Sequence, residues 1–212
     1  MPVLPPSRRY RIMSIRPVLV IGDPQLKQIS QAVPLSLIGS QELAELIDDL
    51  RDTMAARDGA GLAAPQIGVP LRLVIFGISS NPRYPEAAPI PETILINPEL
   101  TPLGDDLESG WEGCLSVPGL RAEVPRTRRL RYRALTPAGA WIEREVEGFH
   151  ARVVQHECDH LDGVLFPDRL APATAASLIA ATASGRFRPQ PGGGPGPPEP
   201  VPAASAAQTI PT

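Results

Sequence analysis

The chain has 212 residues, which is enough for one domain with a sizeable core and a tail at each end. Hydrophobic residues make up 42% and charged residues 20%, and no apolar run is long enough to cross a membrane, so we expect a soluble protein. A net charge of −3 gives no electrostatic basis for sequence-specific binding of nucleic acid.

The two ends of the chain differ in composition from its middle. Residues 1–12 contain arginine and proline but no acidic residue, and we expect a disordered extension there, unless translation starts at Met13 instead of Met1. Residues 188–212 are rich in proline and glycine, so we expect a disordered tail. One catalytic domain should therefore occupy residues 13–187.

The middle of the chain contains helix and strand patterns. Apolar residues recur at helical spacing after Ser40, which is a good N-cap residue, and predict an amphipathic helix over residues 41–57. Strand-like runs follow, and later segments predict two further helices. The predicted strands are residues 71–76, 93–97, 130–135 and 141–146, and the later helices are residues 149–161 and 173–184. Strands grouped together and followed by helices indicate an α+β fold.

Residues 126–133 alternate in the manner of a strand with one arginine-rich face. That face could be solvated or could contact RNA. We favour a solvated strand face, since the net charge of the chain gives no case for RNA as the main partner.

The most informative segment of the chain is residues 155–160, which reads Q-H-E-C-D-H. On a helix, His156 and His160 lie one turn apart on the same face, where two imidazoles can bind one metal ion, and Glu157 lies beside them as a candidate general base. Taken alone, the two histidines could also be hydrogen-bonded core or surface residues. Other segments must decide between these interpretations.

A catalytic zinc-type site usually has three protein ligands and one open position, so a third ligand is needed. Cys114 is the best candidate, because a thiolate suits a first-row metal beside two imidazoles. Cys158 points to the other side of its helix and is predicted to be a small buried residue, and His150 is predicted to be structural. With two cysteines and no secretory signal, we expect a cytoplasmic protein, whose reducing environment keeps the Cys114 thiol available.

Residues 59–66 read G-A-G-L-A-A-P-Q and add small residues where a substrate backbone could pass closely. The segment ends in Gln66, whose amide can donate hydrogen bonds. Taken alone, it could equally be an ordinary glycine loop.

With these residues in view, the chain resembles the peptide deformylases, whose signature segments are G-x-G-L-A-A-P-Q, E-G-C-L-S and Q-H-E-x-D-H. All three match, in order, at residues 59–66, 112–116 and 155–160. The resemblance extends over about residues 13–170. It implies antiparallel strands packed around a central metal-binding helix.

The resemblance also implies a function. The family removes the formyl group from N-formylmethionyl peptides, with Cys114, His156 and His160 as ligands of one divalent metal ion. Fe²⁺ is the expected metal, and Zn²⁺, Ni²⁺ or Co²⁺ are alternatives in isolated protein. Glu157 and Gln66 would be catalytic. Since the family acts on nascent chains, contact with the ribosome stays open, and we expect a monomer.

Further roles follow from the same resemblance. The backbone N–H of Leu115 would share with Gln66 the binding of the oxyanion, and the substrate would contact Ala60, Gly61 and Arg121. Glu112 and Asp159 would orient ligands or loops.

Two rival functions have different requirements. A zinc endopeptidase with this motif would take its third ligand downstream of His160, where the chain has neither histidine nor cysteine. A purely structural metal site would normally be closed by a fourth protein ligand and would have no need of Glu157.

Overall fold

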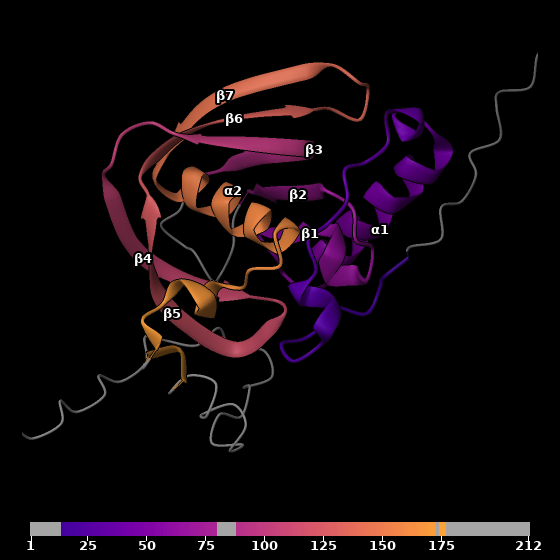
Figure 1. Ribbon diagram of the computed structural model, residues 1–212. Coiled ribbons are helices and arrows are strands. Elements are labelled where there is room, and N and C mark those ends of the chain that lie inside the picture. Colours follow the sequence, from indigo (N-terminus) through magenta and orange to yellow (C-terminus); the bar gives the residue numbers. More distant parts are fainter. Residues whose placement is uncertain (1–13, 80–87, 173, 177–212) are drawn as a thin grey trace, which may run out of the picture.

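The computed structural model describes residues 14–79, 88–172 and 174–176 (Figure 1). The predictions for residues 1–12 and 188–212, and most of the helix predicted for residues 173–184, lie outside this part of the chain. None of the helices described is both long and apolar enough to span a membrane.

The first long helix, α1 (Gln41–Ala56), forms as predicted. The Ser40 hydroxyl accepts a hydrogen bond from the Leu43 backbone N–H at 3.1 Å and so caps a free donor of the first turn. Leu43, Ile47 and Leu50 recur along one face and are buried in the same hydrophobic cluster. This stripe is core, as its spacing predicts.

Five strands form an antiparallel sheet in the order β1-β2-β3-β6-β7. They are β1 (Gly61–Ala63), β2 (Leu73–Ile78), β3 (Ile90–Pro102), β6 (Arg129–Leu135) and β7 (Trp141–Glu147). The four predicted strands correspond to β2, β3, β6 and β7. The observed β3 is much longer than the predicted segment, because its outer half pairs with β6 beyond a register shift.

A second, two-stranded sheet consists of β4 (Leu107–Cys114) and β5 (Val117–Thr127), which pair antiparallel. Sequence patterns did not predict it. Glycine interrupts β4, and both glycine and proline interrupt β5; these residues are more typical of turns than of strands.

The interpretation of residues 126–133 as a single strand is wrong. One strand ends at Thr127 and the next begins at Arg129, and Arg126 is buried. The arginine-rich face is confirmed for β6 itself, where Arg131 lies on the solvent side and pairs with Glu145 at 2.6 Å. Glutamates of β7 thus face this arginine row, so a solvated face explains it.

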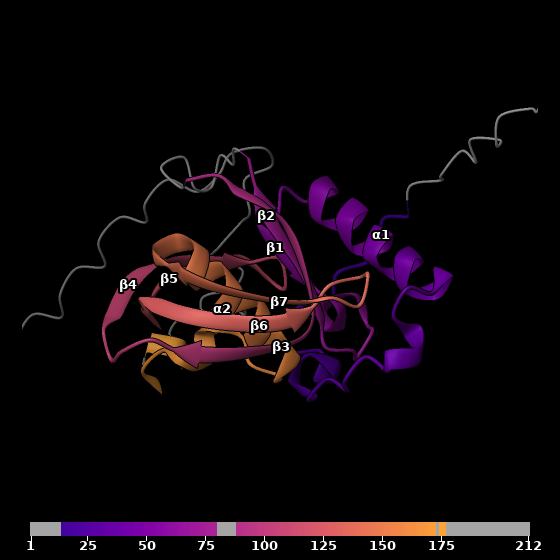
Figure 2. The ribbon, with the colours of Figure 1, turned by 90° about the horizontal axis from the view of Figure 1, so that it is seen from above.

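The second long helix, α2 (Gly148–Leu161), lies between the five-stranded sheet and the β4–β5 hairpin (Figure 1). Both faces of β2 are covered by helices. On one face Val74 and Phe76 share a core cluster with α2, and on the other Leu73 and Ile75 share a cluster with α1. Figure 2 shows α1 beyond β1 and β2, clear of α2. A near-continuous apolar strand is therefore required here.

Four short 3₁₀ helices complete the described part of the structure. Their bounds are Pro24–Lys27, Leu35–Leu37, Ala64–Ile67 and Phe166–Arg169. The Ser30 N–H donates to the carbonyl of Leu161 at 2.8 Å, and Gly163 leaves room for the backbone of Lys27. A third hydrophobic cluster packs the first and the last of these helices against the hairpin, through Leu26 and Phe166.

Candidate metal centre

The three predicted ligands come together from two separate elements. His156 and His160 lie one turn apart on α2, and Cys114 is the last residue of β4. One ligand atom of each residue lies within 4.8 Å of the others, and all three side chains are buried. The Cys114 Sγ lies 3.3 Å from the His160 Nε2.

This donor set fits a divalent first-row metal ion. A thiolate and two imidazoles supply three ligands, as in catalytic sites that keep one position open. In the part of the chain that the structure describes, no second group of histidine, cysteine or acidic side chains meets the same distance criterion. Downstream, Asp162 is paired with Arg72 and Asp168 with Lys27, so neither acid serves as an additional ligand.

Glu112 fixes the orientation of one histidine. Its Oε2 lies 2.8 Å from the Nδ1 of His156, which leaves the Nε2 of that ring for a metal. Burial would raise the pKa of Glu112, but hydrogen bonds from Arg126 and His156 outweigh burial and lower the pKa to about 2. Glu112 is thus a carboxylate at neutral pH.

A buried arginine joins the two acidic residues that were expected to support the site. Arg126 donates from Nε and Nη2 to the two oxygens of Glu112, at 2.8 and 2.9 Å, and from Nη1 to Asp159 at 2.6 Å. Arg169 completes the group with a bond to Asp159 at 2.5 Å. Ion pairs of Arg126 therefore link the β4–β5 hairpin to α2, next to the residues that would bind the metal.

Glu157 lies on the cavity side of α2 and is only 5% exposed. Its Oε2 has no hydrogen-bond partner among the described residues, and burial chiefly raises its pKa to about 7. A Cβ atom built on Gly61 would lie under 3.0 Å from the Glu157 carboxylate. Only glycine at position 61 leaves room for this carboxylate in its observed position.

The Gln66 amide has a fixed orientation. Its Oε1 accepts a hydrogen bond from the Ala63 N–H at 2.8 Å, so its NH₂ group faces the site. That group donates to the Ser116 hydroxyl at 3.0 Å and lies 3.5 Å from the Cys114 Sγ. Leu115 follows Cys114 in the turn between β4 and β5.

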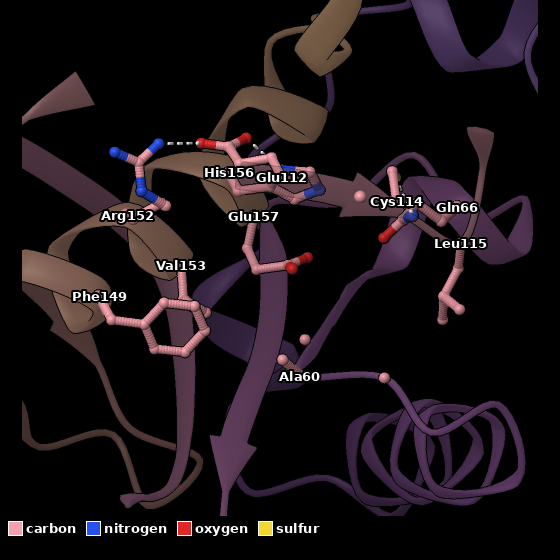
Figure 3. A pocket seen from close by; sticks show the side chains of 13 residues that line it. Ala60, Gln66, Glu112, Cys114, Leu115, Phe149, Arg152, Val153, His156 and Glu157 are labelled. Atoms are coloured by element: carbon pink, nitrogen blue, oxygen red, sulfur yellow. Dashed lines mark hydrogen bonds and ion pairs between the residues drawn. The ribbon is translucent and has the colours of Figure 1, made fainter. Parts of the chain in front are cut away.

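Most of these groups line one open cavity. Its lining comprises Gly59, Ala60, Gly61, Gln66, Glu112, Gly113, Cys114, Leu115, Phe149, Arg152, Val153, His156 and Glu157. Figure 3 shows the Glu157 carboxylate in its middle, with Cys114 and Gln66 on one side and Phe149 on the other. The cavity can place a small carbonyl compound beside a metal, a base and amide donors.

The metal ligand His160 is not among the lining residues, and the other predicted site residue outside the lining is Arg121. It pairs with Gly113 across the β4–β5 ladder, and its stem covers the position that a Gly113 side chain would need. The two residues predicted to be structural lie elsewhere. Cys158 is buried in the core, and His150 packs against the rings of Phe76 and Tyr132.

Sequence patterns assigned no role to three further residues at the site. Ser116 accepts the Gln66 bond, Gln155 exchanges hydrogen bonds with the backbone of Thr127, and Arg152 bonds to Glu112. Ser116 and Gln155 lie at the ends of two signature segments, which was the available signal for them, and Arg152 precedes His156 by one turn on the same helix. Spacing alone does not reveal what such side chains contact.

Comparison with known proteins gives consistent results. A family model described as polypeptide deformylase matches residues 15–176. Peptide deformylase 1 of Prochlorococcus marinus is 60% identical over 159 residues, which are 74% of this chain and 82% of that protein. Peptide deformylase 1 of Nitrosomonas europaea is 59% identical over 156 residues, covering 74% and 88% of the two chains.

Solved structures also match. A class I type b peptide deformylase from Acinetobacter baumannii, described as Met-Ala-Ser bound, is 38% identical with a TM-score of 0.73 and covers 75% of this chain and 100% of its own. A peptide deformylase from Legionella pneumophila is 34% identical with a TM-score of 0.70, covering 82% and 96%.

Proposed function

The chain belongs to the peptide deformylase family, whose reaction removes the N-terminal formyl group from nascent polypeptides, and from this premise we propose how its own residues perform that reaction. The observation that carries the proposal is the cluster of Cys114, His156 and His160, with Glu157 in the same cavity. The overall change is hydrolysis of a formamide to formate and a free amine.

Cys114, His156 and His160 would hold one divalent ion, with the Nε2 of His156 turned toward it by Glu112. When bound, such an ion lowers the pKa of a water molecule and polarises a carbonyl oxygen. We propose Fe²⁺, on the family resemblance, with Zn²⁺, Ni²⁺ or Co²⁺ as substitutes. An activity that is lost in air and restored by anaerobic addition of Fe²⁺ would identify iron.

Glu157 would act as general base and then as general acid. Its carboxylate takes one proton from water, and the oxygen of that water bonds to the formyl carbon. The C–N bond then breaks, formate leaves, and Glu157 returns the proton to the amine nitrogen. Among the described residues the Glu157 Oε2 has no hydrogen-bond partner, which leaves it available to carry a proton.

The negative charge on the former carbonyl oxygen needs donors placed in advance. The Gln66 NH₂ group and the backbone N–H of Leu115 would supply them. The hydrogen bond from Ala63 to the Gln66 Oε1 keeps the NH₂ group on the side of Cys114 and Ser116, so the amide does not have to flip before it can donate to the substrate.

The substrate side of the cavity would bind the formylmethionyl peptide. Ala60 and Gly61 offer backbone without large side chains, and Phe149 and Val153 offer apolar surface. Arg121 would shape this side of the cavity indirectly, because its aliphatic stem packs over Gly113, which is one of the lining residues. The Acinetobacter neighbour, described as bound to Met-Ala-Ser, supports a methionyl peptide as ligand.

The test is a formate-release assay with formyl-Met-Ala, run beside a peptide that offers only internal amide bonds. Formate release without internal cleavage supports the proposal. Cleavage of the internal bond would indicate an endopeptidase, and absence of both activities in metal-loaded protein would indicate a structural metal site.

Replacing Gln66 with alanine should lower kcat by about 10² to 10³-fold with little change in KM, because the oxyanion forms only during the reaction. Gln66→Met is the matched variant, since it keeps the buried volume but has no donor. Metal content should stay intact in both. A raised KM at constant kcat would instead make Gln66 a ground-state binding residue.

We propose that residues 13–187 form the catalytic domain and that both ends are dispensable for catalysis. A chain from Met13 to Arg188 should fold and deformylate a dipeptide at the rate of the full chain, because neither end has an apolar pattern that could join a core. Thermal unfolding and formate release measure this. A melting temperature lower by several degrees would contradict the proposed boundaries.

Three further proposals concern the setting of the reaction. One chain supplies all three ligand atoms, which supports a monomer that light scattering can test. The substrate class and the need for a reduced Cys114 support a cytoplasmic location. Contact with the ribosome, proposed because the substrate is a nascent chain, can be tested by cosedimentation.

A further inference from the structure

Arg152 is a buried arginine on α2, only 6% exposed and one helical turn before His156. Its guanidinium makes several hydrogen bonds across to the hairpin. Nη1 donates to Glu112 Oε1 at 2.9 Å and to the carbonyl of Val124 at 2.6 Å, and Nη2 donates to the carbonyl of Glu108 at 2.5 Å. A longer bond of 3.2 Å reaches the carbonyl of Gly110.

These bonds connect the two elements that carry the metal ligands. Cys114 and Glu112 belong to β4, whereas both histidines belong to α2, and β4 pairs with β5 outside the main sheet. Arg152 therefore joins α2 to both strands of the hairpin and to the carboxylate that orients His156. A shift of the hairpin relative to α2 would change the distance from Cys114 to the histidines.

The strand is shaped to receive this side chain. A Cβ atom built on Gly110 would lie 2.9 Å from the Cζ of Arg152, so a larger residue there would displace the guanidinium. Figure 3 shows Arg152 turned toward Glu112 at the edge of the cavity. Nη1 and Nη2 both donate to the protein, so these bonds hold the guanidinium against the hairpin.

The Glu112 carboxylate is fixed from two sides. Arg126 bonds to both of its oxygens, Arg152 adds a bond to Oε1, and His156 bonds to Oε2. Such a planar arrangement requires the fork of a guanidinium, and a lysine ammonium cannot reproduce it.

We propose that Arg152 is a positioning residue that sets the geometry of the metal ligands, by holding β4 against α2 and by fixing the carboxylate that orients His156. The inference rests on the proposed metal site. Loss of a group that orients a ligand typically weakens metal binding by about 10 to 100-fold.

The first test uses protein loaded with Co²⁺, whose thiolate-to-cobalt absorption reports the Cys114 bond. Arg152→Lys keeps the charge and should release Co²⁺ to a chelator about 10 to 100-fold faster than wild type. Arg72→Lys is the matched control, because Arg72 also bonds to the end of α2, at the Leu161 carbonyl and at Asp162 directly after the helix, and neither of these bonds reaches a ligand. Its release rate should equal that of wild type.

The second test separates positioning from general destabilisation. Arg152→Ala preserves the helix, since alanine has the highest helix propensity, and vacates space beside the cavity. Methylguanidinium at a low, non-denaturing concentration should slow Co²⁺ release toward the wild-type rate, whereas methylammonium, which lacks the planar fork, should not.

Wild-type release rates in both Arg152 variants would overturn the inference. So would faster release that methylguanidinium does not slow. Absence of thiolate-to-cobalt absorption in wild-type protein is a different result, because it would contradict the proposed metal site itself.

Discussion

Replacing Glu157 with glutamine should leave metal content unchanged and lower kcat by about 10² to 10⁴-fold, the usual contribution of a general acid–base group. Glutamine has nearly the same shape but can neither accept a proton from water nor return one to the amine. The Glu157 carboxylate lies so close to Gly61 that a Cβ atom there would collide with it, so a replacement at position 157 must have nearly the same size. Glutamine meets this requirement.

The control for this variant is Glu123→Gln, which removes a carboxylate from the exposed side of β5 and should have wild-type kcat and metal content. Formate release and metal analysis must be made on the same samples. A loss of less than about tenfold in Glu157→Gln would indicate another base. A loss of metal would indicate that Glu157 is itself a ligand.

Replacing Cys114 with alanine should remove both the bound metal and the deformylase activity. The thiolate is the one ligand from the hairpin. Two imidazoles on one helical turn bind a metal ion much more weakly than the same two imidazoles together with a thiolate. Metal per chain after dialysis, measured with formate release, checks this prediction.

Cys158→Ala provides the matched control, because it removes the other buried thiol without touching the site. It should lose some stability through the small space it leaves in the core, yet retain full metal content and activity. Full metal stoichiometry and activity in Cys114→Ala would reject Cys114 as a ligand.

The helices were predictable because their physics is local. Ser40 caps α1, an apolar stripe recurs with the period of a helix, and the two histidines four residues apart indicate a helix on which they share a face. The predicted end at residue 57 differs from the observed Ala56 by one residue, because Arg57 already has a non-helical backbone.

The β4–β5 hairpin was not predictable from the same patterns. Two of its glycine and proline residues are explained only by the tertiary structure: Gly110 leaves room for Arg152, and Pro125 is tolerated because both strands of a two-stranded sheet are edge strands. A residue that looks like a turn signal can thus be required by a close contact with another element.

The electrostatics behind the ligands were equally hidden. Arg126 looked like part of an exposed arginine row but is buried between Glu112 and Asp159, because it lies on the same buried face of β5 as Ala122 and Val124. Burial and pairing depend on the tertiary fold and not on composition. By contrast, the residues of the three motifs were identifiable because each chemical role requires a particular side chain.

The central claim is that one sulfur from β4 and two imidazoles from α2 bind a single metal ion with one position left open. X-ray absorption spectroscopy of zinc-loaded protein measures this directly. We expect one sulfur neighbour at about 2.3 Å, two imidazole nitrogens at about 2.0–2.1 Å and one further light atom. A spectrum without a sulfur neighbour, or with four protein ligands, would contradict the account.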